Sequence, residues 1–197
     1  MKYILLSILL INSLVANAKS VTVFTAQGGD FNLLEFIPKV VSSDLKMDPS
    51  YFVGINYADQ ANIPILTKYL SDKGFKTEVE LQLSKHHGMQ DNYEVHSAIL
   101  ARSKNFNTIG FINTNFAFGV GVSHAMGTPW YEDTESGSID GKRYKTQNYL
   151  AFEVEMATQR SSWSIPIRLH HRSGMYGLIA PEKVGSNFIA VGIRRKF

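Results

Sequence analysis

Segments in which apolar and polar side chains alternate strictly recur along the whole chain. In Glu78–Ser84, valine and leucine side chains fall on one face while glutamate, glutamine and serine fall on the other. Tyr149–Met156 and Trp163–Leu169 repeat the pattern, and Asn187–Phe197 ends the chain with it. Because successive side chains of a β-strand point to opposite faces, a period of two predicts strands that separate an apolar environment from a polar one.

Four less regular segments also have strand character: Val21–Ala26, Tyr51–Tyr57, Tyr93–Arg102 and Thr108–Val122. Together these segments make about eight strands, the smallest even number common among outer-membrane barrels. We therefore expect an all-β fold, an eight-stranded antiparallel transmembrane β-barrel. A soluble lipocalin-like barrel shows the same alternation with its faces reversed, and periodicity alone does not separate the two.

The N-terminus has the features of an export signal. Lys2 supplies a positive charge, Tyr3–Val15 is an apolar stretch too short to span a bilayer as a helix, and Ala16-Asn17-Ala18 offers a small-x-small cleavage site. This predicts a cleaved signal peptide over residues 1–18 and a barrel domain over residues 19–197, located in the outer membrane of a Gram-negative cell. The alternative is an uncleaved anchor. The chain has no cysteine, so disulfides do not contribute to its stability.

The connections between strands differ in length. We expect the first strand to run outward from the periplasm, so the connections that follow odd-numbered strands face the outside of the cell. These are Gly29–Ser50, His87–Asn92, Ser123–Gln147 and Gly174–Ser186. The inner connections are Ala58–Lys76, Ser103–Asn107 and Thr158–Ser162, of which Ala58–Lys76 is long enough to hold a short helix. The terminal Phe197, with Gly192 before it, resembles the C-terminal signal read by the outer-membrane barrel-assembly machinery, although Arg195 stands where that signal is usually apolar.

A histidine and a serine stand out near the end of the seventh predicted strand. His171 and Ser173 share the parity of Trp163, Ile165 and Ile167, so a membrane barrel places them on its lipid face near the outer rim. Residues two apart on a strand are about 6.5 to 7 Å apart at the backbone, within reach of an imidazole and a hydroxyl. This spacing suits a histidine base and a serine nucleophile.

The tract His170-His171-Arg172-Ser173-Gly174 resembles the His-x-Ser motif of the lipid A 3-O-deacylase family. Phe152–Glu155, Gly185–Asn187 and Gly192–Phe197 extend the similarity toward a bacterial branch of deacylase-like and acyloxyacyl hydrolase-like barrels, over roughly the C-terminal two-thirds of the chain. The resemblance implies an outer-membrane serine esterase that hydrolyses an ester-linked acyl chain of lipopolysaccharide in the outer leaflet. Ser173 would be its nucleophile and His171 its general base.

The third catalytic residue departs from that family. There a glutamate on the final strand orients the histidine, whereas the residue of matching register here is Asn187. Asparagine can fix the imidazole tautomer through its carbonyl oxygen but brings no charge. Glu182 is the acidic alternative, and the sequence leaves the choice open. Gly174 replaces the asparagine that helps form the oxyanion site in the family, so only its backbone N–H remains for that role.

Other polar residues favour structural roles. Glu153 and Glu155 have lumen parity, as expected of ion pairs inside a narrow barrel. His86 and His87 near Asp91 lack the spacing of a known metal site, so no metal and no cofactor are predicted. A net charge of +3 is too small to indicate nucleic acid. The alternative function is a non-enzymatic small outer-membrane barrel with a structural or surface-interaction role, and whether the chain forms a homo-oligomer stays open.

Overall fold

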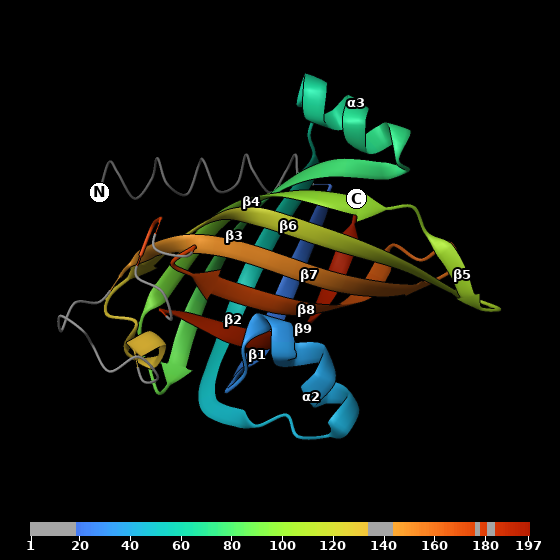
Figure 1. Cartoon of the computed structure of the whole chain (residues 1–197). Coiled ribbons are helices and arrows are strands. Elements are labelled where there is room, and N and C mark those ends of the chain that lie inside the picture. The colour runs from blue at the N-terminus through green and yellow to red at the C-terminus, as the bar shows by residue number, and fades with distance from the viewer. Residues whose placement is uncertain (1–18, 134–143, 176–177, 181–183) are drawn as a thin grey trace, which may run out of the picture.

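A computed structural model describes residues 19–133, 144–175, 178–180 and 184–197, which form a single closed antiparallel barrel (Figure 1). The predicted signal peptide, residues 1–18, lies outside the described residues. The barrel strands are β1 (Ser20–Gly29), β2 (Met47–Gln60), β3 (Phe75–Gly88), β4 (Tyr93–Ser103), β6 (Ile112–Met126), β7 (Thr146–Thr158), β8 (Trp163–Ser173) and β9 (Gly185–Lys196). Each pairs with its neighbours in chain order, and pairing of β1 with β9 closes the ring of eight. The predicted eight-stranded fold is confirmed.

The segment expected as one strand over Thr108–Val122 is instead a hairpin. β5 (Phe106–Ile109) pairs with the first residues of β6, and the chain reverses at Gly110, whose φ is +51°. That backbone conformation suits glycine because it has no Cβ. The prediction of a single strand was therefore wrong at this end, since the alternation continues through a tight turn.

Helical segments lie at both ends of the barrel. The loop end, where the four outer connections were expected, carries η1 (Leu33–Glu35) and α2 (Phe36–Ser42) between β1 and β2, and η2 (Trp130–Asp133) between β6 and β7. The opposite end of the barrel, called the terminal end because Lys19 and Phe197 lie there, carries α3 (Pro64–Asp72) between β2 and β3. This confirms the helix expected in the long inner connection Ala58–Lys76. Within the described ranges, no helix is both long and apolar enough to cross a membrane.

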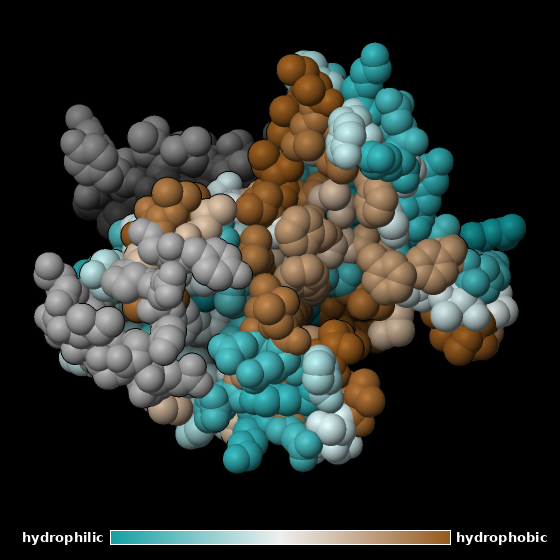
Figure 2. Space-filling view, viewed as in Figure 1, coloured by the Kyte–Doolittle hydropathy of each residue, from teal (hydrophilic) through white to brown (hydrophobic). Residues whose placement is uncertain are grey.

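The outer wall is apolar. Side chains that alternate along the strands leave these apolar residues exposed: Val53, Ile55, Val79, Leu81, Leu83, Phe118, Val120, Phe152, Ile165, Ile167, Val191 and Ile193. On the face seen in Figure 2, hydrophobic surface gathers across the middle of the molecule. A water-soluble barrel would bury such residues, whereas a lipid-facing wall exposes them. The soluble alternative is therefore excluded.

The lumen is filled with paired charges. Arg168 contacts Glu80 and Glu153 at 2.8 and 2.7 Å, and Arg194 contacts Glu153 at 2.8 Å and also pairs with Glu155. These side chains are buried. The expected lumen ion pairs are therefore confirmed.

Candidate active site

The loop end of β8 presents different residues to the two sides of the wall. His170 and Arg172 are fully buried in the lumen, while His171 and Ser173 are half-buried on the outside, in the same parity as the exposed Trp163. The predicted register is therefore confirmed. The sequence places an imidazole and a hydroxyl beside the apolar belt because the strand keeps its alternation to its last residue.

Asn187 of β9 lies directly opposite His171 in the strand pairing. The imidazole Nδ1 is 2.7 Å from Asn187 Oδ1, and Asn187 Nδ2 donates to the Phe31 carbonyl oxygen at 2.5 Å. Because a carbonyl can only accept, the second bond fixes the amide with its NH₂ toward Phe31 and its oxygen toward His171. His171 Nδ1 is then the donor, which leaves Nε2 unprotonated and able to accept a proton.

Ser173 lies on the same outer face of β8 as His171. Its strand partners are Asn148 of β7 and Gly185 of β9, and in this conformation no hydrogen bond joins it to His171 within the described chain. The two residues share one outer face at two-residue spacing, about 6.5 to 7 Å apart at the backbone. A Cβ at Gly185 would collide with the Arg172 carbonyl, so close packing of β8 and β9 beside Ser173 requires a glycine there.

The expected oxyanion donor is already engaged. Gly174 N–H donates to the Val184 carbonyl at 3.1 Å, and the Gly174 carbonyl accepts from Ile179 and Ala180. These bonds begin the turn after β8, where Met175 has a φ of +54°. In this conformation the Gly174 N–H is therefore not free to stabilise an oxyanion. Glu182, the alternative third residue, lies outside the described residues.

The connection between β1 and β2 folds against the wall beside His171. Phe31 is buried, and a Cβ on Gly29 would collide with its ring, so glycine allows this close return. Lys39 of α2 binds Glu35 at 3.0 Å, and this contact holds the pKa of the Glu35 carboxyl below its ordinary value. No sequence pattern indicates Phe31, because its contact with the site is made by a backbone carbonyl.

The lumen side of the same wall is braced by a loop residue. Glu132 of η2 is buried, pairs with Arg172, and accepts from Ser186 Oγ at 3.0 Å. Both partners are strand residues next to the candidate site, one on each of β8 and β9. Glu132 was not found from the sequence, because it lies in a predicted loop, where no strand alternation indicates the direction of a side chain. It fixes the spacing of the two strands that carry His171 and Asn187.

A described cavity lies at a different place from the candidate site. A cavity of about 460 Å³ opens at the terminal end and is lined by residues that include Lys19, Lys76, Arg102 and Lys196. These belong to the first residue before β1 and to the terminal-end parts of β3, β4 and β9. The candidate site is therefore a surface site at the edge of the lipid belt, not a lumen pocket.

Two solved structures share this architecture. The outer membrane enzyme PagL aligns with a TM-score of 0.51 at 13% identity, over 89% of this chain and 99% of that one. Neisserial surface protein A aligns with a TM-score of 0.50 at 12% identity, over 90% and 96%. The chain has the fold of an outer-membrane barrel. No protein-family model and no curated protein sequence matches it, so activity has to be argued from the site.

Proposed function

We propose that this chain is an outer-membrane serine esterase that removes an ester-linked acyl chain from lipid A. The observation that carries the proposal is the oriented pair of His171 and Asn187, placed outside the barrel two residues from Ser173. A buried catalytic centre would have to extract its lipid from the membrane. A site on the wall meets the acyl chains where they already lie.

The chemistry needs only these residues, the lipid and water. His171 Nε2 takes the proton of Ser173 as Oγ attacks the ester carbonyl. The tetrahedral intermediate collapses, the C–O bond to the sugar hydroxyl breaks, and His171 returns its proton to that oxygen. Water, deprotonated by the same Nε2, then attacks the acyl-serine carbonyl. The bond between the acyl carbon and Ser173 Oγ breaks, His171 returns the proton to Oγ, and the fatty acid leaves. Asn187 keeps Nδ1 protonated throughout, although it supplies no charge to the imidazolium.

The helix α2 supports a lipid substrate. Leu34 of η1 is 86% exposed, and Ile37 and Val41 of α2 are 65 and 80% exposed. They lie on a segment whose Phe31 carbonyl accepts a hydrogen bond from Asn187. Exposed apolar side chains on a short helix at the end of a lipid-facing wall suit the interface between acyl chains and headgroups. We expect this segment to border the acyl chain that enters the site.

The test is mass spectrometry of lipid A incubated with the purified barrel in detergent micelles. We expect wild type to remove one acyl chain, and Ser173→Ala and His171→Ala to lower the rate by similar large factors, because nucleophile and base act as a unit. Ser97→Ala and His124→Ala are matched controls on the outer wall and should retain activity. Equal activity of Ser173→Ala and wild type would refute the proposal.

A second candidate is a non-enzymatic barrel. Ser173 and His171 are not joined by a hydrogen bond in the described structure, and the Gly174 N–H already donates to Val184. The structural match to Neisserial surface protein A, with a TM-score of 0.50, is also about as good as the match to PagL, with 0.51. Under this alternative the braced loop end would serve interaction at the cell surface. Wild-type protein that is folded in micelles yet leaves lipid A and short-chain esters intact would favour it.

A further inference from the structure

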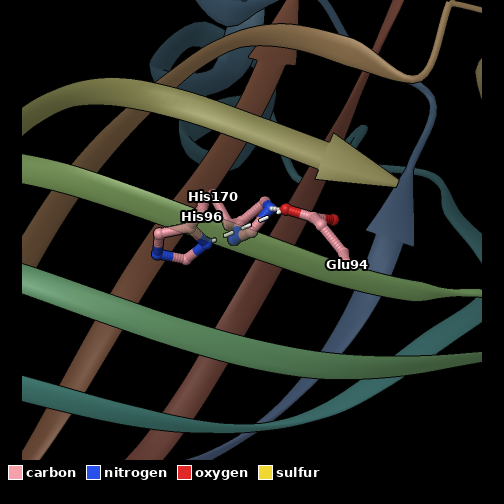
Figure 3. Close-up of side chains that lie close together, drawn as sticks. All are labelled: Glu94, His96 and His170. Atoms are coloured by element: carbon pink, nitrogen blue, oxygen red, sulfur yellow. Dashed lines mark ion pairs between the residues drawn. The ribbon is translucent and has the colours of Figure 1, made fainter. Parts of the chain in front are cut away.

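Three buried side chains converge inside the barrel, on the opposite side of the wall from Ser173. Glu94 and His96 come from β4 and His170 from β8, and all three are almost completely inaccessible (Figure 3). Their candidate ligand atoms all lie within 4.8 Å of one another. Sequence reasoning missed this cluster because β4 and β8 are distant in sequence and are not neighbours in the sheet.

We propose that Glu94, His96 and His170 bind one divalent transition-metal ion, zinc in particular. Tetrahedral zinc with bonds of about 2.0 to 2.2 Å to nitrogen and oxygen separates its ligand atoms by about 3.3 to 3.5 Å. Glu94 Oε1 lies 3.1 Å from His170 Nε2 and 3.8 Å from His96 Nδ1, on either side of that value. Two histidines and a glutamate are a ligand set that zinc uses in proteins.

Neighbouring residues already orient these ligands. His96 Nε2 lies 3.3 Å from Glu80 Oε1, the carboxylate–histidine arrangement that commonly supports a metal-bound imidazole. The His96 ring also stacks on Tyr149 at 3.8 Å between centroids. Ser123 Oγ donates to Glu94 Oε1 at 2.8 Å. Little rearrangement is therefore needed for these groups to receive an ion.

One further observation calls for a cation at this place. His96 Nδ1 is buried without a hydrogen-bond partner, yet it is the nitrogen that faces Glu94. A metal ion held between Glu94 and His96 would satisfy this nitrogen.

The consequence is a cross-link through the lumen. β4 and β8 share no backbone hydrogen bonds, so an ion held by both would join strands that the sheet leaves separate. Binding to the folded barrel alone would stabilise it by mass action. This site does not depend on Ser173 or His171, and its role is independent of the proposed esterase.

The experiment measures zinc bound to the full chain folded in detergent. Protein stripped with a chelator is dialysed against Zn²⁺ and then against metal-free buffer, and its metal content is measured by mass spectrometry. We expect one zinc ion per wild-type chain and none in the double variant His96→Gln/His170→Gln. His124→Gln is the matched control, since His124 lies exposed on β6, and it should retain the ion. Ser123→Ala should weaken binding by roughly 10- to 100-fold.

Folding is monitored by heat-modifiable electrophoretic migration, so that loss of the barrel is not mistaken for loss of the site. If the double variant does not fold, Glu94→Gln serves in its place and should abolish both zinc binding and the rise in melting temperature that Zn²⁺ gives the wild type. Wild type without bound zinc, retention of zinc by the folded ligand variants, or equal loss in His124→Gln would overturn the proposal.

Discussion

At the residue scale, Asn187 does two things that a glutamate would not do together. Its oxygen accepts from His171 and its NH₂ donates to the Phe31 carbonyl, so one side chain links the imidazole to the segment leading into α2. A carboxylate could keep the first bond but not the second, because it has no proton to donate when ionised. The departure from the deacylase motif thus has a local physical reason.

Two substitutions separate these roles. Asn187→Leu removes both bonds and should lower the rate of ester hydrolysis by about 10²- to 10⁴-fold, since an unoriented histidine adopts the wrong tautomer. Asn187→Asp keeps an acceptor for His171 and should stay within about tenfold of wild type, while hydrogen exchange of residues 30–46 becomes faster. If hydrogen exchange of residues 30–46 is not faster in either variant, the hydrogen bond from Asn187 to the Phe31 carbonyl does not stabilise this segment.

At the element scale, Arg195 near the end of β9 contacts two aromatic rings. Arg195 is on the outer face, with its guanidinium 5.4 Å from the Trp163 ring and 5.1 Å from the Phe197 ring. Cation–π contacts of this kind are worth about 0.5 to 1 kcal/mol at exposed sites. Phe197 N–H also donates to the Lys19 carbonyl at 2.9 Å, which joins the last residue of the chain to the residue before β1.

Deletion of Phe197 should therefore lower the amount of assembled barrel in outer-membrane fractions. The truncated chain loses the terminal aromatic ring and the hydrogen bond to Lys19. Arg195→Ala, which keeps both, should have a smaller effect. Heat-modifiable protein is measured by immunoblot at matched expression, and normal assembly without Phe197 would contradict its role as an assembly signal.

The exposed apolar side chains of η1 and α2 give a second prediction at this scale. Replacing Leu34, Ile37 and Val41 together by serine removes the apolar contact with the acyl layer. Full burial of one such side chain is worth about 1.5 to 3 kcal/mol. We expect at least a tenfold lower rate on lipid A in membranes and little change on a soluble short-chain ester. Equal loss on both substrates would mean that the helix shapes the site itself.

At the scale of the whole molecule, the barrel reverses the polarity of a soluble domain. Its wall is apolar because lipid is its solvent, and its narrow interior holds arginines and glutamates that neutralise each other. Glu153 lies at the centre of this network, within 2.9 Å of Arg102, Arg168 and Arg194. Removing one partner of a buried ion pair leaves an uncompensated charge.

Glu153→Ala should therefore destabilise the barrel by about 3 to 5 kcal/mol. Glu78→Ala removes a carboxylate that pairs with Arg102 at 2.8 Å but is partly solvated, so it should cost less. Urea unfolding in detergent, followed by heat-modifiable migration, compares the two variants. A Glu153→Ala barrel as stable as wild type would mean that water replaces the lost carboxylate in the lumen.

The strands, their faces and the outward parity of His171 and Ser173 could be predicted from the sequence, because a period of two acts residue by residue along each strand. The turn at Gly110 was not predicted, because apolar and polar residues continue to alternate through a hairpin. The hydrogen bonds of Asn187, the engaged N–H of Gly174 and the brace from Glu132 depend on loops that fold back onto the wall. The meeting of Glu94, His96 and His170 depends on barrel closure, which brings together strands that no local pattern relates.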